Sequence, residues 1–550
     1  MTRPRAVASL AAIALVPVLP FAFGYGRQDF IFHVESWISL RDEWLSGHLL
    51  PGWAAAASFN LGDPHLGLYP PLSFLLGALL TLILPIAVVP AAFVWIAVLG
   101  CGLSMYYVSR SFLAQQDRLA AAILYMLSPY VIANATVRFA AAELLLQAFL
   151  PLILLAAYRL INPTVHREER GQIPVLAGLV ALAWLTNLPG SIVLFYGLSI
   201  LAVVVAIQQR SVKPALRIAA AEALGLGLAA FRLLPTWAEH SWIKEAVLYK
   251  RDPRMGLLFM RPPAFPDNVL MLVFWLFLCS EAAVIFVCLR RRSEPLSAAN
   301  RTWAWLAGIA ILFQIAIAYP LWSILPQLRV VQFPFRFLLF LAPILPLLLL
   351  APATSKALRR PVYLAVAALS IVPLVLFIAM QSAVRGEHIT TLAATWHSQG
   401  YESAPEYIPT GATAPTHPIR LSPIIPLYRS CSVNLLQSDG LTRSFTADSP
   451  HPCPVALPVF FYPSWRAVDE AGKAIATSTG PAGLLLVTVP AGSHTVTVDF
   501  HPASRQRTAG LIISLAALLL LMVLLMLNRR VLFVLKRSPA IPEPTRQTLV

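Results

Sequence analysis

The chain has 550 residues, of which 58% are hydrophobic and only 12% charged, and its mean hydropathy is +0.72. Soluble domains carry about 25% charged residues, so this composition excludes an ordinary soluble protein and predicts a polytopic α-helical membrane protein. The net charge of +16 does not indicate nucleic-acid binding, because the basic residues fall in short clusters between apolar runs, as the orientation of membrane helices requires.

About twelve apolar runs are long enough to be predicted as membrane-spanning helices. The first follows a short basic N-terminus like that of a signal sequence, but its length favours an uncleaved anchor. In chain order the runs are residues 6–24, 86–108, 119–135, 143–161, 174–188, 189–207, 218–235, 269–289, 303–320, 335–353, 361–380 and 508–527.

One further apolar run, residues 72–84, is too short to cross the membrane upright and is bracketed by Pro70, Pro71 and Pro85. If it crossed, every later basic cluster would move to the outer side of the membrane. We therefore predict a re-entrant or juxtamembrane helix here. A short tilted hairpin with the next helix is the alternative.

This topology divides the chain into four parts. The parts are a transmembrane domain at residues 1–380 with an outer loop at 25–85, an extracytoplasmic β-rich domain at 381–507, a final transmembrane helix at 508–527 and a basic cytoplasmic tail at 528–550. The loops 236–268 and 321–334 and a turn around Arg138 fall on the same outer side.

The segment 381–507 is richer in Pro, Ser, Thr and His than the rest of the chain, and its apolar runs have the length of strands. Residues 454–461, 483–489 and 494–500 read as strands separated by Pro, Ala and Gly turns, which predicts a small β-sandwich. Cys431 and Cys453 fall in this segment. An oxidising compartment permits a disulfide between them, and two free thiols are the alternative.

The first outer loop carries two acid–histidine pairs. Asp29 and His33 are four residues apart, which on a helix puts both on one face and suits a base with an orienting partner or two metal ligands. Asp63 and His65 form a second pair on a turn. An aqueous loop is expected to contain charges, so a solvated loop without chemistry remains the alternative.

Glu143 opens an apolar helix directly after Arg138, and the predicted topology places it near the outer membrane surface. A carboxylate favoured by the positive end of the helix dipole is one reading. The other is that Glu143 completes a carboxylate cluster with Asp29, because the same topology makes its turn face the first outer loop.

Cationic side chains on the outer loops offer partners for a phosphate. Arginine at a membrane surface suits bidentate capture of a phosphate, and the phosphate of a lipid-linked donor lies at that depth. Attraction to anionic lipid headgroups is the alternative. The candidates are Lys244, Arg254, Arg329 and Arg336.

The sequence has no Gly-rich loop of the kind that binds nucleotide phosphates, and no Cys and His residues at the spacing of a zinc site. A protein driven by ATP hydrolysis is therefore not predicted.

Several short motifs share the predicted outer face and together span nearly the whole chain. Their order resembles the GT-C superfamily of membrane glycosyltransferases and, more narrowly, the YfhO-like and pyruvoyl-tetrahydropterin-synthase-related bacterial membrane proteins; nothing in the sequence indicates pterin chemistry. The motifs are Asp29 with His33, residues 47–53 (GHLLPGW), 60–64 (NLGDP), 69–72 (YPPL), 138–143 (RFAAAE), 331–337 (VQFPFRF) and 461–465 (FYPSW).

The resemblance implies a GT-C-like fold in a bacterial cytoplasmic (inner) membrane. It also implies transfer of a sugar from a polyprenyl-phosphate donor to an extracytoplasmic glycan or lipid acceptor. It assigns catalysis to Asp29, as base or metal ligand, and to Glu143, as the acid of the second outer loop. A divalent metal held by these two is left open, because Glu143 has no neighbouring aspartate. The expected substrate-binding residues are His33, Asp63, His65, Arg138, Lys244, Arg254, Arg329 and Arg336.

The alternative function is a non-catalytic transporter or a scaffold for assembly of envelope polysaccharide. Transporters usually place ionisable groups at mid-helix depth. In this sequence the charged groups cluster at one predicted surface. Glu222 and Gln314 are the main buried polar exceptions, and they read as packing or helix-pairing groups. This distribution favours an enzyme.

Overall fold

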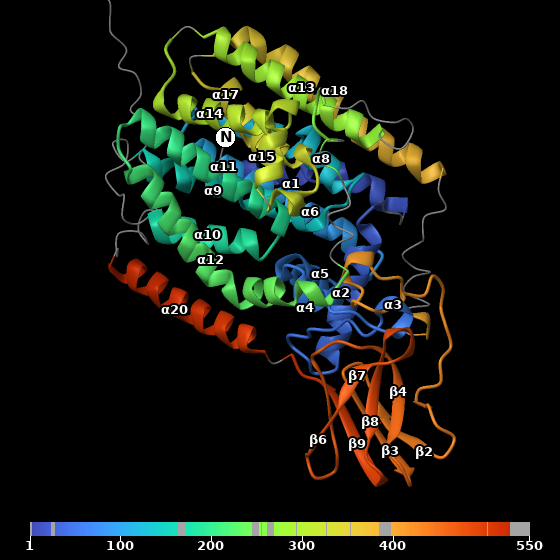
Figure 1. The fold of residues 1–550 in the computed structure, drawn as a ribbon. Helices are drawn as coiled ribbons and strands as arrows, with labels where there is room; N and C mark the ends of the chain where they lie inside the picture. The colour runs from blue at the N-terminus through green and yellow to red at the C-terminus, as the bar shows by residue number, and fades with distance from the viewer. Residues whose placement is uncertain are drawn as a thin grey trace, which may run out of the picture.

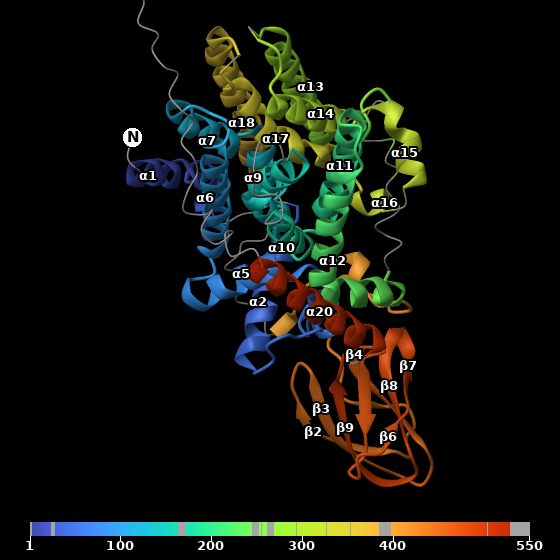
Figure 2. The same cartoon turned by 90° about the vertical axis from the view of Figure 1, so that its left-hand side faces the viewer.

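The computed structural model describes residues 3–23, 28–162, 172–244, 269–292, 294–325, 327–352, 354–383, 398–502 and 504–527, together with Asp252, Arg254 and residues 256–260. The basic tail predicted at residues 528–550 lies outside the described residues. A helical body forms most of the molecule, and the strands gather at one end of it, next to the helices of the first loop (Figure 1). The strand-rich end and the helices α13 and α18 lie at opposite ends in both views (Figure 2).

The first loop folds into short helices before the long apolar ones begin. The helices are α1 (Arg3–Ile13), η1 (Val16–Phe23), α2 (Phe30–Leu45), α3 (Ala57–Asn60), α4 (His65–Leu68), α5 (Pro71–Ile83), α6 (Val89–Ser109), η2 (Gln115–Asp117), α7 (Arg118–Met126), α8 (Pro129–Ala135), α9 (Ala141–Ile161), α10 (Gln172–Trp184), α11 (Leu188–Gln208), α12 (Lys213–Glu239), η4 (His240–Trp242), α13 (Val269–Arg290), α14 (Ala298–Leu312), η7 (Ala316–Ala318), α15 (Tyr319–Ile324), α16 (Leu328–Val331), η8 (Pro334–Phe337), α17 (Leu338–Leu349), η9 (Lys356–Leu358), α18 (Arg359–Ala383), η10 (Pro405–Tyr407) and α20 (Arg505–Leu527).

Within the described part of the chain, seven helices are long and apolar enough to cross a membrane, or eight if the bent pair α7 and α8 is one span. The prediction of about twelve spans is therefore not confirmed. Proline explains much of the difference. The first run leaves the α-helix after Ile13 and continues as a 3-10 helix through Pro17 and Pro20, and the third run bends by 46° before Pro129.

The short helix predicted at residues 72–84 is present as α5. It begins at Pro71, where a missing N–H costs nothing, and ends at Ile83 before Pro85. It packs against α2 and also contacts α6 and α9. Gly77 permits the contact with α2, because a Cβ at this position would lie 2.3 Å from the Trp37 ring.

Two antiparallel sheets form the C-terminal β region. Their orders are β1-β4-β8-β7 and β2-β3-β9-β5-β6. The three predicted strands are present as β4, β8 and β9. The strands are β1 (Ile425–Pro426), β2 (Ser432–Ser438), β3 (Thr442–Ser449), β4 (Cys453–Phe460), β5 (Trp465–Val468), β6 (Ala474–Ile475), β7 (Thr477–Thr479), β8 (Leu484–Val489) and β9 (Gly492–Phe500).

Side chains of both sheets share one apolar core, as in a β-sandwich. Phe445 and Val498 come from the five-stranded sheet, and Val455 and Val487 come from the other. Trp53 of the first loop also belongs to this core and packs against the rings of Trp465 and Phe500. The first loop is thereby part of the hydrophobic core of the β region.

A buried ion pair attaches the β region to the helices. Arg507, at the start of α20, donates two hydrogen bonds to the Glu239 carboxylate at the end of α12, at 2.8 and 2.7 Å. The Tyr462 hydroxyl, which follows β4, donates to the same carboxylate at 3.0 Å. From this point α20 returns along α12, so the last helix lies beside the helical body (Figure 2).

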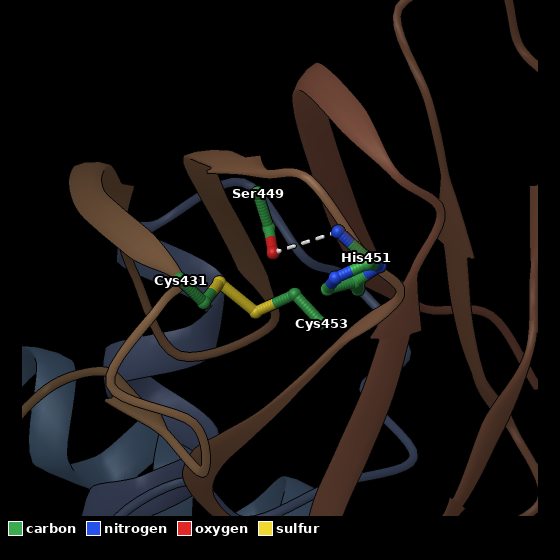
Figure 3. Close-up of a disulfide and its surroundings, with 4 residues drawn as sticks. All are labelled: Cys431, Ser449, His451 and Cys453. Atoms are coloured by element: carbon green, nitrogen blue, oxygen red, sulfur yellow. Dashed lines mark hydrogen bonds between the residues drawn. A yellow bond between two sulfur atoms is a disulfide. The ribbon is translucent and has the colours of Figure 1, made fainter.

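The predicted disulfide between Cys431 and Cys453 is present, and both cysteines are buried. It joins the start of β2 in one sheet to the start of β4 in the other, with a Cα–Cα distance of 6.0 Å. Figure 3 shows Ser449 and His451 beside it, where the His451 backbone N–H donates to the Ser449 hydroxyl at 3.4 Å. The bond therefore ties the two sheets together at one end of the sandwich.

Replacing Cys431 and Cys453 together by alanine is expected to lower the stability of the β region by about 3 kcal/mol, since a disulfide closing a loop of this size contributes about 2–4 kcal/mol. The measurement is urea unfolding of the full chain followed by tryptophan fluorescence, because Trp53 and Trp465 lie in this core. Cys279→Ala, at an exposed free cysteine, is the control. Equal unfolding midpoints for both variants would contradict the expectation.

Candidate functional site

A buried ion cluster surrounds Glu143, which lies in the first turn of α9 and is only 1% exposed. Its Oε2 atom lies 3.0 Å from Arg138 Nη1 and 3.6 Å from Arg336 Nε. The Tyr130 hydroxyl donates to the other carboxylate oxygen. Two guanidinium groups and a phenol therefore surround one carboxylate in an apolar part of the molecule, which favours its ionised form.

The bent pair α7 and α8 supplies two members of this cluster. Ser128 caps α8 by accepting a hydrogen bond from the Val131 N–H at 3.3 Å. The helix then carries Tyr130 and Asn134 four residues apart on one face. Arg138, in the turn that follows, donates to both Asn134 and Glu143. Its guanidinium is thus fixed between α8 and α9.

Asp29 joins the cluster from the first loop. It is exposed and lies immediately before α2, and its backbone N–H donates to the Arg138 carbonyl at 3.2 Å. Its carboxylate interacts electrostatically with Arg138 and Arg336. Burial alone would lower the pKa of Arg138, but the Glu143 and Asp29 carboxylates outweigh it, so this pKa lies above its usual value. The structure therefore brings together Asp29, Arg138, Glu143 and Arg336.

Arg336 differs from Arg138 in how its donors are used. It is 8% exposed, and within the described part of the chain its Nε and Nη1 atoms have no hydrogen-bond partner. Its ion pair with Glu143, at 3.6 Å, is too long for a hydrogen bond. A buried guanidinium with unused N–H groups is suited to bind an anion, and its planar fork matches a phosphate.

Aromatic rings hold the two guanidinium groups in place. The Arg138 guanidinium lies over the Phe335 ring at 5.1 Å, and that of Arg336 lies over the Phe333 ring at 5.9 Å. Phe335 stacks on Phe274 of α13, with 3.9 Å between ring centroids. The predicted motif at residues 331–337 therefore connects the ion cluster to α13.

His33 lies on α2 one turn after Asp29, but its imidazole is buried among rings. The rings of Trp37 and Phe139 lie 6.2 Å from it, and Nδ1 has no hydrogen-bond partner among the described residues. Burial lowers the pKa of His33 to about 3, so the ring is neutral at physiological pH. Its environment is that of a packing residue at the edge of the site.

Asp63 and His65 form a second buried unit. His65 Nδ1 lies 2.6 Å from Asp63 Oδ1, and Nε2 lies 3.1 Å from the Ser36 hydroxyl. The Ser36 hydroxyl also donates to the Phe32 carbonyl at 2.6 Å, so the imidazole, Ser36 and the backbone of α2 form one hydrogen-bonded chain. The Asp63–His65 pair thereby ties the turn at residues 63–65 to α2.

The three other predicted cations have contacts different from those of the ion cluster, and their binding of a phosphate stays a prediction. Lys244 donates to the Ala412 carbonyl at 2.6 Å and thereby holds the chain that leads to the β region. Arg254 is exposed and pairs with Asp252. Arg329 is exposed on α16. The charge of a loop residue does not by itself show whether its side chain is buried. Of the four predicted cations only Arg336 is buried, and it stands in the aromatic and proline motif at residues 331–337.

Tyr69 and Tyr130 are site residues that were not predicted as such, and Arg232 holds the backbone of Tyr69. Arg232 of α12 donates to the Tyr69 carbonyl from Nε at 3.1 Å and from Nη2 at 2.6 Å. Burial raises the pKa of Tyr69 above its usual value, and the Asp29 carboxylate acts in the same direction. Tyr69 stands in the YPPL motif, but Tyr130 and Arg232 lie inside apolar runs that predict only helix.

Within the described residues, no group of three or more His, Cys, Asp or Glu side chains is arranged to hold a metal ion. Both oxygens of Glu143 face donors, namely Tyr130 on one side and the two guanidinium groups on the other. Such a donor environment does not fit a divalent cation, which requires oxygen ligands directed at it.

The chain belongs to the 6-pyruvoyl-tetrahydropterin synthase related family of membrane proteins, whose sequence model matches residues 66–388. This confirms the predicted family and the predicted membrane class. No curated protein matches the chain.

Two solved structures of arabinofuranosyltransferase AftD from Mycobacteria are similar in part. The first, of a mutant, is 18% identical with a TM-score of 0.41, and the match covers 70% of this chain and 28% of that one. The second is 18% identical with a TM-score of 0.39, and it covers 72% and 27%. The chain thus spans less than a third of the length of that enzyme.

Arg138→Leu is expected to destabilise the protein by about 3–5 kcal/mol, because removing one partner of a buried ion pair leaves the other charge uncompensated. The measurement is the thermal unfolding midpoint of the purified protein in detergent. Arg254→Leu is the matched control and should leave the midpoint unchanged, since its ion pair is exposed. Similar midpoints for the two variants would contradict a structural role for Arg138.

His33 is expected to make the protein less stable in acid. Its imidazole is neutral in the folded protein down to about pH 3, whereas the unfolded chain takes up a proton near pH 6.5, so stability is lost as the pH falls between these values. The loss by pH 5 is about 2 kcal/mol at 1.36 kcal/mol per pKa unit. His33→Gln should remove this part of the decrease between pH 7 and pH 5, and His417→Gln, at an exposed histidine, should not. A His33→Gln profile identical to that of the native protein would refute the assignment.

Proposed function

We propose that the protein is a membrane glycosyltransferase of the GT-C type, which moves a sugar from a polyprenyl-phosphate donor to an extracytoplasmic glycan or lipid. The observation that carries the proposal is the buried Arg336 guanidinium, with two unused nitrogen donors, beside the exposed carboxylate of Asp29. The cation is suited to the phosphate of a donor and the carboxylate to the hydroxyl of an acceptor.

In this mechanism Arg336 binds the donor phosphate through its Nε and Nη1 groups. Glu143 and Arg138 hold the guanidinium region in place, because both are committed to each other and to Tyr130 and Asn134. As the bond between the anomeric carbon and the phosphate oxygen breaks, the departing phosphate gains charge. A preorganised cation that meets this charge typically contributes about 100-fold or more to the rate.

Asp29 accepts the proton of the acceptor hydroxyl while that oxygen attacks the anomeric carbon. One C–O bond forms and one breaks, the leaving polyprenyl phosphate keeps the electron pair, and the configuration inverts. A positioned base contributes about 100- to 10,000-fold. No step passes through a divalent metal, because the surroundings of Glu143 do not fit one.

The membrane arrangement follows from the predicted topology. Asp29, the turn with Arg138 and η8 all belong to segments predicted on the extracytoplasmic side of the bacterial inner membrane, as does the β region. The short helix α5, which packs against α2, is placed to line the entrance for the lipid. The β region, whose core includes Trp53 of the first loop, is placed to hold the acceptor.

A transporter or scaffold is the alternative, and buried carboxylates within apolar helices favour it. Glu222 of α12 and Glu281 of α13 are such groups. They line two separate cavities, which share no lining residue. Two cavities without a shared lining residue give no support for a continuous path through the membrane, and for this reason we prefer the enzyme.

Asp29→Asn and Arg336→Lys are expected to lower sugar transfer by about 100-fold or more each, since the first removes the base and the second removes the planar fork. The assay uses membranes that contain each variant, with polyprenyl-phosphate sugars as donors and release of polyprenyl phosphate as the readout. Arg466→Lys, at an exposed position in β5, should retain full activity. Full activity of Asp29→Asn would exclude Asp29 as the base, and full activity of both variants would leave the site without this function.

A further inference from the structure

Tyr69 is a half-buried phenol beside the ion cluster, and the reaction proposed above assigns it no part. It follows α4 in the YPPL motif, with the extended backbone (φ −74°, ψ 146°) that a residue before proline prefers. Among the described residues its hydroxyl has no hydrogen-bond partner. The hydroxyl of a tyrosine that is largely buried usually has one, so the unused donor needs a reason.

Packing holds the Tyr69 ring in place. The ring stacks on Phe74 of α5, with 4.6 Å between centroids, and meets the Phe32 ring of α2 edge to face at 5.4 Å. The Tyr69 carbonyl accepts hydrogen bonds from Arg232 of α12, and two prolines follow in the chain. Contacts with three helices therefore restrict the movement of the phenol.

The Tyr69 hydroxyl lies within the electrostatic field of the ion cluster. Asp29 is the strongest of the charged groups that act on it, followed by Arg336 and Glu143. Asp29 and Phe32 are three residues apart at the start of α2, so they share one face of that helix. The Tyr69 ring packs on this face. The phenol thus stands beside both the acid assigned to the acceptor and the cation assigned to the donor.

The phenol keeps its proton in these surroundings. Burial and the carboxylates of Asp29 and Glu143 all raise the pKa of Tyr69, because each of them disfavours a phenolate. A neutral phenol has one O–H donor and an oxygen that accepts. Tyr69 is therefore suited to donate a hydrogen bond to an anion, and it is not a base at neutral pH.

Two oxygen atoms of the proposed reaction could accept this hydrogen bond, and their chemistry differs. The acceptor oxygen attacks the anomeric carbon, and a hydrogen bond donated to it would withdraw electron density that the attack needs. The departing phosphate gains charge, so a hydrogen bond donated to it becomes stronger as the bond to the sugar breaks. A phenol donor therefore lowers the barrier at the phosphate and not at the acceptor.

We propose that the Tyr69 hydroxyl donates a hydrogen bond to the donor phosphate and completes, with Arg336, the site for this group. The inference rests on the proposed function, because it places Tyr69 in the same transfer. Arg336 binds the phosphate through Nε and Nη1, and Tyr69 contacts a further oxygen. No proton leaves Tyr69. The acceptor proton goes to Asp29, and the polyprenyl phosphate leaves with the electron pair of the broken C–O bond.

The test compares two tyrosines of one group of rings, in the full chain in lipid nanodiscs. Tyr69→Phe removes the hydroxyl and keeps the ring. Tyr407→Phe, the control, does the same at a half-buried tyrosine whose ring lies 6.5 Å from that of Tyr69. The strongest charged neighbour of Tyr407 is Glu406, which is not a member of the ion cluster. Farnesyl phosphate and farnesol are the binding probes, because they differ only in the phosphate. Sugar transfer is measured as kcat and KM.

Tyr69→Phe is expected to weaken the binding of farnesyl phosphate about tenfold, since it removes one hydrogen bond to a charged group. It should lower kcat about 100-fold, because the lost bond is strongest when the phosphate departs. The affinity of Tyr69→Phe for farnesol should equal that of the native protein. Tyr407→Phe should change neither the affinity for farnesyl phosphate nor kcat.

Native affinity of Tyr69→Phe for farnesyl phosphate would overturn the proposal, and so would an equal loss of affinity for farnesol, because the hydroxyl would then have no contact with the phosphate. Arg336→Lys separates this failure from failure of the proposed function. If Arg336→Lys weakens the binding of farnesyl phosphate and Tyr69→Phe does not, only the role of Tyr69 is lost. If neither substitution weakens it and the native protein transfers no sugar, the proposed function fails as well.

Discussion

The charge of Glu143 is the constraint on which the site depends. Moving a carboxylate into an apolar protein interior costs several kcal/mol after relaxation, and only well-placed counter-charges and hydrogen bonds offset this. Here the counter-charges come from the turn before α9 and from η8, nearly 200 residues later in the chain. The same turn offers its Arg138 carbonyl to the Asp29 N–H. One buried charge thus fixes the relative positions of three distant segments.

The balance of charge within the cluster explains why its two arginines differ. Arg138 uses its donors on Asn134 and Glu143, so it is part of the scaffold. Arg336 faces the same carboxylate only through a long contact and keeps two buried nitrogens unused. A buried guanidinium with unsatisfied N–H groups costs free energy unless a hydrogen-bond acceptor binds it. The second carboxylate, Asp29, is exposed, so the cluster combines one accessible acid with a guanidinium whose hydrogen-bonding capacity is not filled.

Topology and periodicity predicted much of this arrangement, because they depend on local sequence. Hydropathy located the helices, and the distribution of Lys and Arg brought Asp29 and Glu143 to one side. Alternating Val496, Val498 and Phe500 located β9. The predicted number of spans is not confirmed among the described residues, because hydropathy does not register the 3-10 turns and bends that prolines introduce. The place of Lys244 depends on the Ala412 carbonyl, a contact between distant segments that no local pattern records.

Three carboxylates within the apolar helices are compensated in different ways, and the differences follow from their neighbours. Glu143 has two guanidinium groups and a phenol. Glu222 has one hydroxyl, from Ser199. Glu281 has none among the described residues for Oε2, although two serines line the same cavity. Those serines bond to backbone at the α8 cap and within α13. The helix break that positions Tyr130 for Glu143 also places Ser128 in the wall of the cavity that Glu281 lines, so one bend in the chain shapes the surroundings of both acids.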